Sequence, residues 1–298
     1  MNISAIDQIV VANTLGECVL WCEQQQCLWW TDIQESTLYR LSWPGKKLQC
    51  FETPERLCAF AFTEEEAVFI AAFETGFASY NWQTGEVDWL HRLFDKGSGI
   101  RLNDGRMDGD GRFWCGAMIE ANHKNFTEGA SLYSLESNGE LIQHFSRIDI
   151  SNGICTSPDN TEFYFADSVK RSIHRFDLDK GQLTNPRQIV STEEGASPDG
   201  SVTDKDGILW NAQWGTGKLL AYNRDGKILL ERQCPVSQMT CLCFGGPNMD
   251  LIFATSAHDG LNNQQLNQEQ GAGDLFVFKS SSQGQLSHRF RLKALRSQ

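Results

Sequence analysis

The sequence predicts an all-β fold, a six-bladed β-propeller of four-stranded blades. The first observation behind this prediction is a repeat: a polar turn followed by a short apolar run occurs six times along the 298 residues. The second is a hairpin pattern, two short strand-like segments around Asp, Asn or Gly, which follows each apolar run. The third is that no apolar stripe with a period of 3.6 residues reaches helix length.

The repeats align on one bulky aromatic residue in each apolar run. These aromatic residues lie 40 to 50 positions apart and are Trp29, Phe69, Trp114, Tyr164, Trp210 and Phe253. A period of this length, with about four short strands in each repeat, is typical of a propeller blade. Aromatic residues make up 11% of the chain, and this enrichment also favours strands over helices.

The two ends of the chain are predicted to close the ring. Segment 6–11 (IDQIVV) is expected to pair with segment 288–295 (HRFRLKAL), because such pairing protects exposed sheet edges. Residues 1–298 are thus expected to form one propeller domain. Two polar segments, 120–129 and 258–273, interrupt the repeat. We expect these loops to cover the channel mouth and set substrate size, the alternative being solvated connections without a role.

Charge and hydropathy exclude several partners. The formal net charge is −12, which repels a phosphate backbone and argues against nucleic acid, although solubility alone also explains it. The N-terminal segment lacks a basic stretch followed by a long apolar one, so no signal peptide is expected. No stretch approaches 18 apolar residues, so no membrane partner is expected. The protein is predicted to be cytoplasmic and to be a monomer or a weak homo-oligomer.

Ten cysteines are present, and the sequence favours free, buried, structural thiols. The alternative is a thiolate metal site. No pair of cysteines has CxxC spacing, and no histidine lies at zinc-finger distance from a cysteine pair. Cys241 and Cys243 point the same way in a strand-like segment, but no second pair matches them.

Counting back from the aromatic residues identifies a candidate site. In a propeller the innermost strands line a central channel, so residues at one phase of the repeat lie in one ring. The positions 11 or 12 residues before the aromatic anchors are Glu17, Cys58, Asn103, Asn152, Asp199 and Cys241. Asn and Asp favour turns anyway, so each one alone could be an ordinary turn residue. Their shared phase instead indicates that they converge on the axis.

A ring of this composition suits a metal ion. The carboxylates of Glu17 and Asp199 would repel each other and lose solvation unless a cation or proton lay between them. Carboxylate and amide oxygens are typical ligands of a hard divalent cation. No histidine shares this phase, which argues against a histidine-rich zinc site. The alternative is a pair of carboxylates that flank a glycosidic bond.

Several motifs resemble those of one known family. They include RLNDG at 101–105, DGRFWCGAM at 110–118, DISNGICTSPD at 149–159, SPDGSVTDKDGILWNAQW at 197–214 and CFGGPNMDLIFATSAHDGL at 243–261. Over nearly its whole length the chain resembles the senescence-marker-protein, gluconolactonase and regucalcin family. The resemblance implies one divalent metal ion on the axis (Ca, Zn, Mn, Mg or Fe) with Glu17, Asn152 and Asp199 as its ligands.

The resemblance also implies an activity: metal-dependent hydrolysis of a sugar lactone to the aldonic acid. Arg101, Asn103 and Glu120 match substrate-binding positions, and Asp104 matches a polar neighbour without an assigned role. A metal ion would polarise the lactone, and Asp199 is the candidate general base, unless it serves only as a ligand.

Two other functions stay open at this point. One is a non-catalytic, calcium-binding regulatory propeller or a protein scaffold, and the other is an esterase or different hydrolase on the same fold.

Overall fold

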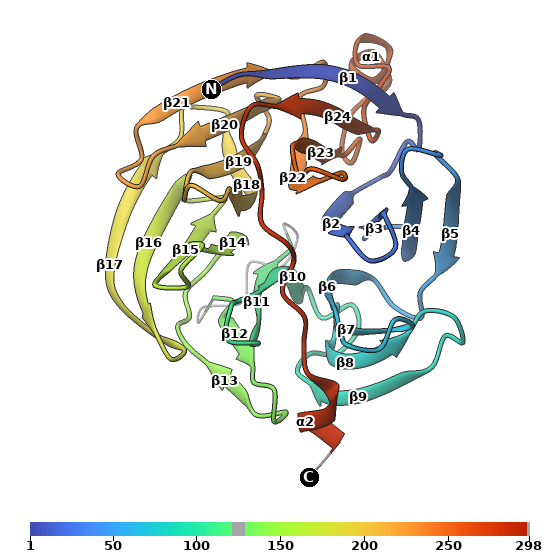
Figure 1. The fold of residues 1–298 in the computed structure, drawn as a ribbon, viewed down its shortest axis with the longest axis vertical. Helices are drawn as coiled ribbons and strands as arrows, with labels where there is room; N and C mark the ends of the chain where they lie inside the picture. The colour runs from blue at the N-terminus through green and yellow to red at the C-terminus, as the bar shows by residue number, and fades with distance from the viewer. Residues whose placement is uncertain (121–128, 297–298) are drawn as a thin grey trace.

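The computed structural model describes residues 1–120 and 129–296, and it confirms the six-bladed propeller. Six four-stranded antiparallel sheets form a ring around a central axis (Figure 1). The innermost strands are β2 (Gly16–Cys22), β6 (Leu57–Phe62), β10 (Ile100–Met107), β14 (Ser151–Thr156), β18 (Ser197–Thr203) and β22 (Met239–Gly245).

Each blade continues outward from the axis as an antiparallel meander. The second strands are β3 (Cys27–Asp32), β7 (Val68–Phe73), β11 (Phe113–Ile119), β15 (Glu162–Asp167), β19 (Leu209–Trp214) and β23 (Leu251–Ser256). The third strands are β4 (Thr37–Ser42), β8 (Gly76–Asn81), β12 (Leu132–Leu135), β16 (Ser172–Asp179), β20 (Lys218–Tyr222) and β24 (Leu275–Ser280). The outermost strands are β5 (Leu48–Glu52), β9 (Val87–Arg92), β13 (Leu141–Gln143), β17 (Gln182–Ser191), β21 (Ile228–Gln233) and β1 (Ile3–Ile9).

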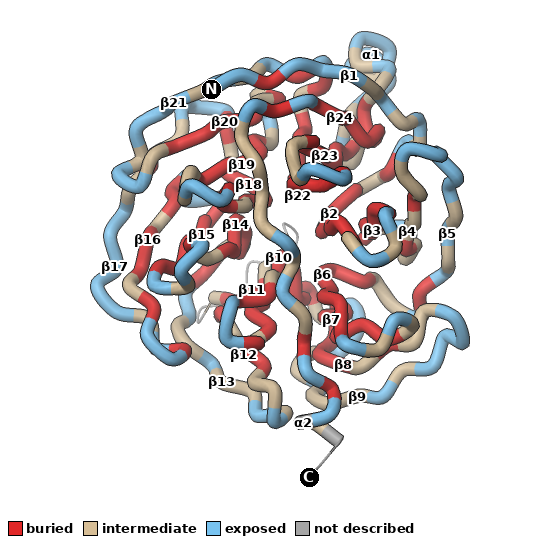
Figure 2. The backbone as a smooth tube through the Cα atoms, viewed as in Figure 1, coloured by how far each residue is buried: buried red, intermediate tan, exposed pale blue. Residues whose placement is uncertain are grey.

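The six aromatic anchors all lie in second strands and are all buried, which confirms the alignment of the repeats. Several pack across the gap between blades. Trp29 meets Phe69 at 5.1 Å between ring centroids, and Trp114 meets Phe163 at 4.6 Å. Burial is strongest on the inner strands and weakest on the outer ones (Figure 2). Apolar packing between adjacent blades thus stabilises the ring.

The predicted closure is wrong in its second partner. Strand β1 is the outermost strand of the last blade, but it pairs with β24, in a register that joins Ile3 to Ser280 and Ile9 to Leu275. Strand β24 has one unpaired edge, and the N-terminal strand β1 pairs with it. Segment 288–295 therefore has no free edge in this blade to pair with. The hairpin expected after β23 therefore supplies only its first strand, β24, to that blade.

The C-terminal segment instead crosses the ring as a strap, residues 284–290 (Figure 1). At its start the backbone N–H of Gly284 donates to the carbonyl of Met249. Gly284 also forms an isolated antiparallel β-bridge with Asp204. At its end Phe290 donates to the carbonyl of Phe62. The short helix α2 (Leu292–Arg296) follows, and the carboxylate of Glu64 accepts hydrogen bonds from the first two backbone N–H groups of this helix.

The two predicted specificity loops have different outcomes. Residues 121–128 lie outside the described part of the chain. Segment 258–273 contains the short helix α1 (Asn263–Gln268), capped by Asn262, at the outer margin of the ring rather than over the axis (Figure 1). Neither α1 nor α2, in the part of the chain that is described, is long and apolar enough to cross a membrane. All ten cysteines are free, and all except Cys50 are buried.

Candidate functional site

All six ring positions lie on innermost strands, at one end of the channel, which we call the polar end. At or beside each of them the pairing with the second strand shifts, as it does between Glu17 and Leu20 and between Asn152 and Cys155. The same shift recurs in the other four blades. A β-bulge bends its strand and re-aims a side chain. The repeated bulge therefore explains how residues of one phase turn toward the axis.

Small residues beside the ring positions let neighbouring strands approach. Gly153 has a φ of +63°, a conformation that glycine adopts without a steric penalty. A Cβ atom on Gly200 would lie 2.8 Å from the Cα of Cys241 on the next blade. In the first blade Cys18 holds the matching positive φ, +49°. In the pairs Asn152-Gly153 and Asp199-Gly200, the glycine therefore allows tight packing at the bulge, and the residue before it supplies a polar side chain.

The structure brings the predicted substrate-binding residues together. The guanidinium of Arg101 donates to Asn103 Oδ1 at 2.7 Å, and Asn103 Nδ2 donates to Asn152 Oδ1 at 3.1 Å. Arg101 also forms an ion pair with Glu120 at 3.5 Å. Of these residues only Glu120 has a substantially exposed side chain, at 27%, and Arg101, Asn103 and Asn152 are buried.

Hydrogen bonds fix the orientation of the Asn152 amide. Its Nδ2 donates to the hydroxyl of Ser168 at 2.8 Å, and that hydroxyl donates to the carbonyl of Pro198 at 2.7 Å. The amide oxygen of Asn152 is therefore the atom that faces Asn103 and the axis. An amide held this way presents an oxygen rather than N–H groups to the channel.

Glu17 and Asp199 are buried carboxyl groups that influence each other. Burial, followed by the nearby charge of Asp104, raises the pKa of Glu17 to about 7. Burial, followed by the charge of Glu17, raises the pKa of Asp199 well above its usual range. Glu17 Oε2 accepts a hydrogen bond from the Cys18 amide at 2.9 Å, whereas Asp199 Oδ1 is buried without a hydrogen-bond partner.

These features fit a divalent cation. An orphaned carboxylate oxygen beside a second buried carboxyl group is costly unless a proton or a cation compensates it. Glu17, Asp199 and the oriented oxygen of Asn152 are hard oxygen donors. Among the described residues, no group of three or more His, Cys, Asp or Glu side chains could hold a metal ion. A site here would take its third oxygen from an amide.

Sequence reasoning missed two arginines, Arg56 at the polar end and Arg106, which lines a cavity at the opposite end of the channel. Arg56 lies two positions before ring position Cys58 and binds Glu120, donating to Oε1 at 2.7 Å. Arg106 lies inside the channel, where a guanidinium nitrogen is 3.7 Å from the sulfur of ring residue Cys241. Its charge opposes the rise that burial causes in the pKa of Asp104. Arg106 directly follows the RLNDG motif at 101–105, so that motif could have pointed to it. No motif or repeat position pointed to Arg56.

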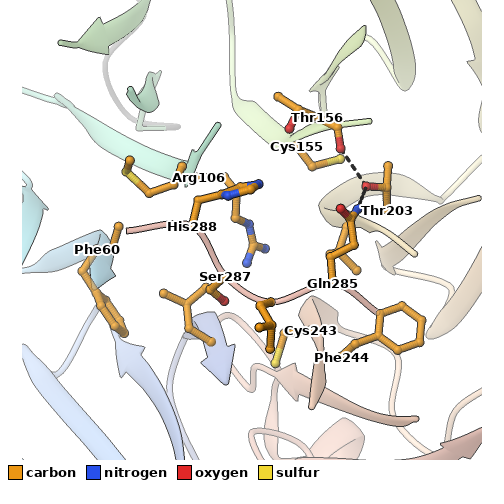
Figure 3. Close-up of a pocket in the computed structure, with 15 residues that line it drawn as sticks. Phe60, Arg106, Cys155, Thr156, Thr203, Cys243, Phe244, Gln285, Ser287 and His288 are labelled. Carbon is orange, nitrogen blue, oxygen red and sulfur yellow. Dashed lines mark hydrogen bonds between the residues drawn. The ribbon is translucent and has the colours of Figure 1, made fainter. Parts of the chain in front are cut away.

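The opposite end of the channel, which we call the strapped end, holds a different environment (Figure 3). A cavity of about 70 Å³ lies there, lined by strap residues Gln285 to His288 and by inner-strand residues such as Leu20 and Val202. None of the six ring residues lines it. A space of this size holds a few water molecules, whereas pockets for drug-sized ligands typically measure several hundred Å³. The predicted ligand residues therefore lie away from this cavity.

Comparison with known proteins identifies the family to which this chain belongs. The family profile described as SMP-30/Gluconolactonase/LRE-like region matches residues 15–258. The chain is 33% identical to L-arabinolactonase of Azospirillum brasilense, over 93% of this chain and 92% of that protein. It is 29% identical to 6-deoxy-6-sulfogluconolactonase of Pseudomonas putida, over 91% and 93%.

A solved structure extends the likeness to three dimensions. The calcium-binding protein regucalcin of Agrobacterium tumefaciens superposes with a TM-score of 0.90 at 28% identity, covering 97% of this chain and 98% of that one. The profile match spans the inner strands of all six blades, from β2 to the end of β23. The chain belongs to the SMP-30/gluconolactonase/LRE-like family.

Proposed function

We propose that this protein is a metal-dependent lactonase that hydrolyses a sugar lactone to the corresponding aldonic acid. The observation that carries the proposal is the orphaned, buried oxygen of Asp199 beside Glu17, in a ring that also holds Asn103 and Asn152. The family membership and the two lactonase relatives support the reaction class. The regucalcin likeness supports a divalent cation, with calcium as one candidate.

The residues of the chain would divide the work as follows. Glu17, Asn152 and Asp199 would hold the cation, which when bound supplies Lewis-acid polarisation of the lactone. Arg101, fixed by its bond to Asn103, would orient the lactone and bind the carboxylate that ring opening creates. Glu120, the most exposed of these side chains, would accept hydrogen bonds from sugar hydroxyl groups.

Asp199 would act as the general base. Its carboxylate would accept a proton from the attacking water as the water oxygen bonds to the carbonyl carbon. That proton would return to the ring oxygen when the bond between this oxygen and the carbonyl carbon breaks. One water is consumed, and one hydroxy acid is formed. Burial and the neighbouring Glu17 raise the pKa of Asp199, so its carboxylate, once ionised, is a stronger proton acceptor than an exposed aspartate.

A panel of aldonolactones with a pH indicator tests the proposal, with and without a chelator. We expect acid release from at least one lactone, which stops in chelated, metal-analysed protein and returns when a divalent metal is added. Full activity without metal would refute metal dependence. Metal binding without turnover on any lactone would instead favour the non-catalytic, calcium-binding alternative, to which the regucalcin likeness gives weight.

A further inference from the structure

Arg56 lies between two glutamates at the rim of the polar end. Its guanidinium donates to Glu74 Oε2 at 2.9 Å and to both carboxylate oxygens of Glu120, at 2.7 and 3.4 Å. The side chain of Glu74 is 3% exposed, that of Arg56 18% and that of Glu120 27%. The contacts therefore run from a buried carboxylate in the β7–β8 turn to a carboxylate that faces the surface.

Arg56, rather than Arg101, is the closer partner of Glu120. Glu120 is held through both oxygens by Arg56 but contacts Arg101 only at 3.5 Å. Arg101 uses a different nitrogen, Nη1, to donate to Asn103 Oδ1 at 2.7 Å. Carboxylates favour two-point pairing with a guanidinium. Without Arg56 we expect Glu120 to turn toward Arg101 and pair with it, while Arg101 keeps its bond to Asn103. Glu120 would then no longer be placed to bind the hydroxyl groups of a sugar.

We propose that Arg56 is a positioning residue that sets specificity for hydroxylated lactones by holding the carboxylate of Glu120 through both of its oxygens. The inference rests on the proposed function, in which Glu120 and Arg101 contact the sugar. Arg56 acts through Glu120, so it matters only for lactones whose hydroxyl groups Glu120 binds. A lactone without hydroxyl groups makes no such bond and does not depend on Arg56.

The test compares two lactones on the metal-loaded, full-length protein: D-glucono-1,5-lactone, which carries hydroxyl groups, and δ-valerolactone, which carries none. For Arg56→Met we expect kcat/KM on the gluconolactone to fall about 10- to 100-fold, the range for losing a hydrogen bond to a charged group, mainly through KM. We expect kcat/KM on δ-valerolactone to stay within about twofold. Arg56→Lys should restore part of the loss, because lysine keeps the charge but lacks the planar fork.

Arg92→Met is the matched control. Arg92 belongs to the same blade and pairs with Glu55 at 2.8 Å, but it contacts neither Glu120 nor Arg101 in the bonds described. Both lactones should be hydrolysed by this variant as by the wild type. Metal content and thermal unfolding are measured for every variant. An equal loss on the two lactones, or no loss on either, would overturn the inference.

A double-mutant cycle keeps the inference testable if Arg56→Met folds poorly. Arg56→Lys and Glu120→Gln are measured singly and together on D-glucono-1,5-lactone. If Arg56 acts through Glu120, the double variant should be no worse than Glu120→Gln alone. Additive losses would overturn the inference while leaving the lactonase proposal intact. A wild type inactive on every lactone would sink both, so the two failures are distinguishable.

Discussion

The two ends of the central channel are built from the same six strands, yet they differ in chemistry. At the polar end Glu17, Asn103, Asn152 and Asp199 face the axis from bulged segments. At the strapped end, three residues further along the same strands, residues such as Leu20 and Val202 lie under the strap. Strands β2 and β18 thus carry an acidic side chain at one end and apolar packing at the other.

The comparison teaches that local backbone irregularity, rather than a separate domain, divides function from stability in this fold. The bulges let a strand that is otherwise a regular core element present polar oxygens on the axis. Substitutions at the polar end should therefore change activity with little effect on folding, and substitutions at the strapped end should do the reverse. Four experiments test this division, in order of decreasing effect.

The largest effect is expected from Asp199→Asn. The variant keeps an oxygen of similar size but loses the proton acceptor, so kcat should fall by about 10² to 10⁴ even at saturating metal. Stopped-flow or indicator assays across metal concentrations measure it. Asp225→Asn, at a turn on the outer side of the same blade, is the control and should be unaffected. Full recovery of kcat at high metal would mean that Asp199 is only a ligand.

Phe290→Ala tests the strapped end. Phe290 is fully buried where the strap meets β6, and truncating a buried phenylalanine typically costs about 3–5 kcal/mol of unfolding free energy. Denaturant unfolding should show this loss, whereas kcat below the unfolding temperature should match the wild type. Leu286→Ala, on the same strap but 55% exposed, provides the control. A fall in kcat without a fall in stability would break the proposed division.

Metal removal probes stability at the polar end. A ligand that binds only the folded state stabilises it by about 2.7 kcal/mol at a concentration of one hundred times Kd. Thermal unfolding should therefore shift upward on metal addition in the wild type. The shift should vanish in Glu17→Gln and Asn152→Ala, which should still fold, and persist in the exposed control Glu86→Gln. A metal-dependent shift that survives in both site variants would place the ion elsewhere.

The smallest effect lies outside the channel, at His144. Its ring packs on Trp114 with centroids 4.4 Å apart, and burial, with help from the Arg112 charge, lowers its pKa to about 4 from an ordinary 6.5. In the unfolded chain His144 therefore becomes protonated below about pH 6.5, whereas in the folded chain it stays neutral until about pH 4. This stability is complete above pH 6.5 and is lost as the pH falls toward 4.

Unfolding measured between pH 7 and pH 4 checks the role of His144. His144→Gln should flatten the pH dependence, by on the order of 2 kcal/mol across the window, since the ring is partly exposed and its shift is only partly realised. Gln143→Ala, at an exposed neighbour without a titratable group, should leave the slope unchanged. An unaltered slope in His144→Gln would assign the acid sensitivity to the carboxyl groups of the channel instead.

The sequence alone was enough to predict the blades and the ring, for a physical reason. Trp29 and its five counterparts must be buried in every blade, so their spacing records the repeat, and residues such as Glu17 and Asn152 inherit a common phase. The bulges left a weaker trace, the glycines after Asn152 and Asp199. The strap left none, because backbone groups of distant blades anchor it. Arg56 lies beside a ring position occupied by cysteine, so ligand chemistry gave no reason to select it.

The strap affects how substrate enters and product leaves the central channel. A ring of blades would otherwise be a tube with two mouths, but the strap crosses one of them, between blades that lie on opposite sides of the axis. In the proposed lactonase the hydroxy acid must then leave by the route through which its parent lactone arrived. An outgoing product that carries a carboxylate would meet Arg101 on the way. Product should therefore compete with fresh substrate, and accumulating aldonic acid should slow the enzyme without altering its limiting rate.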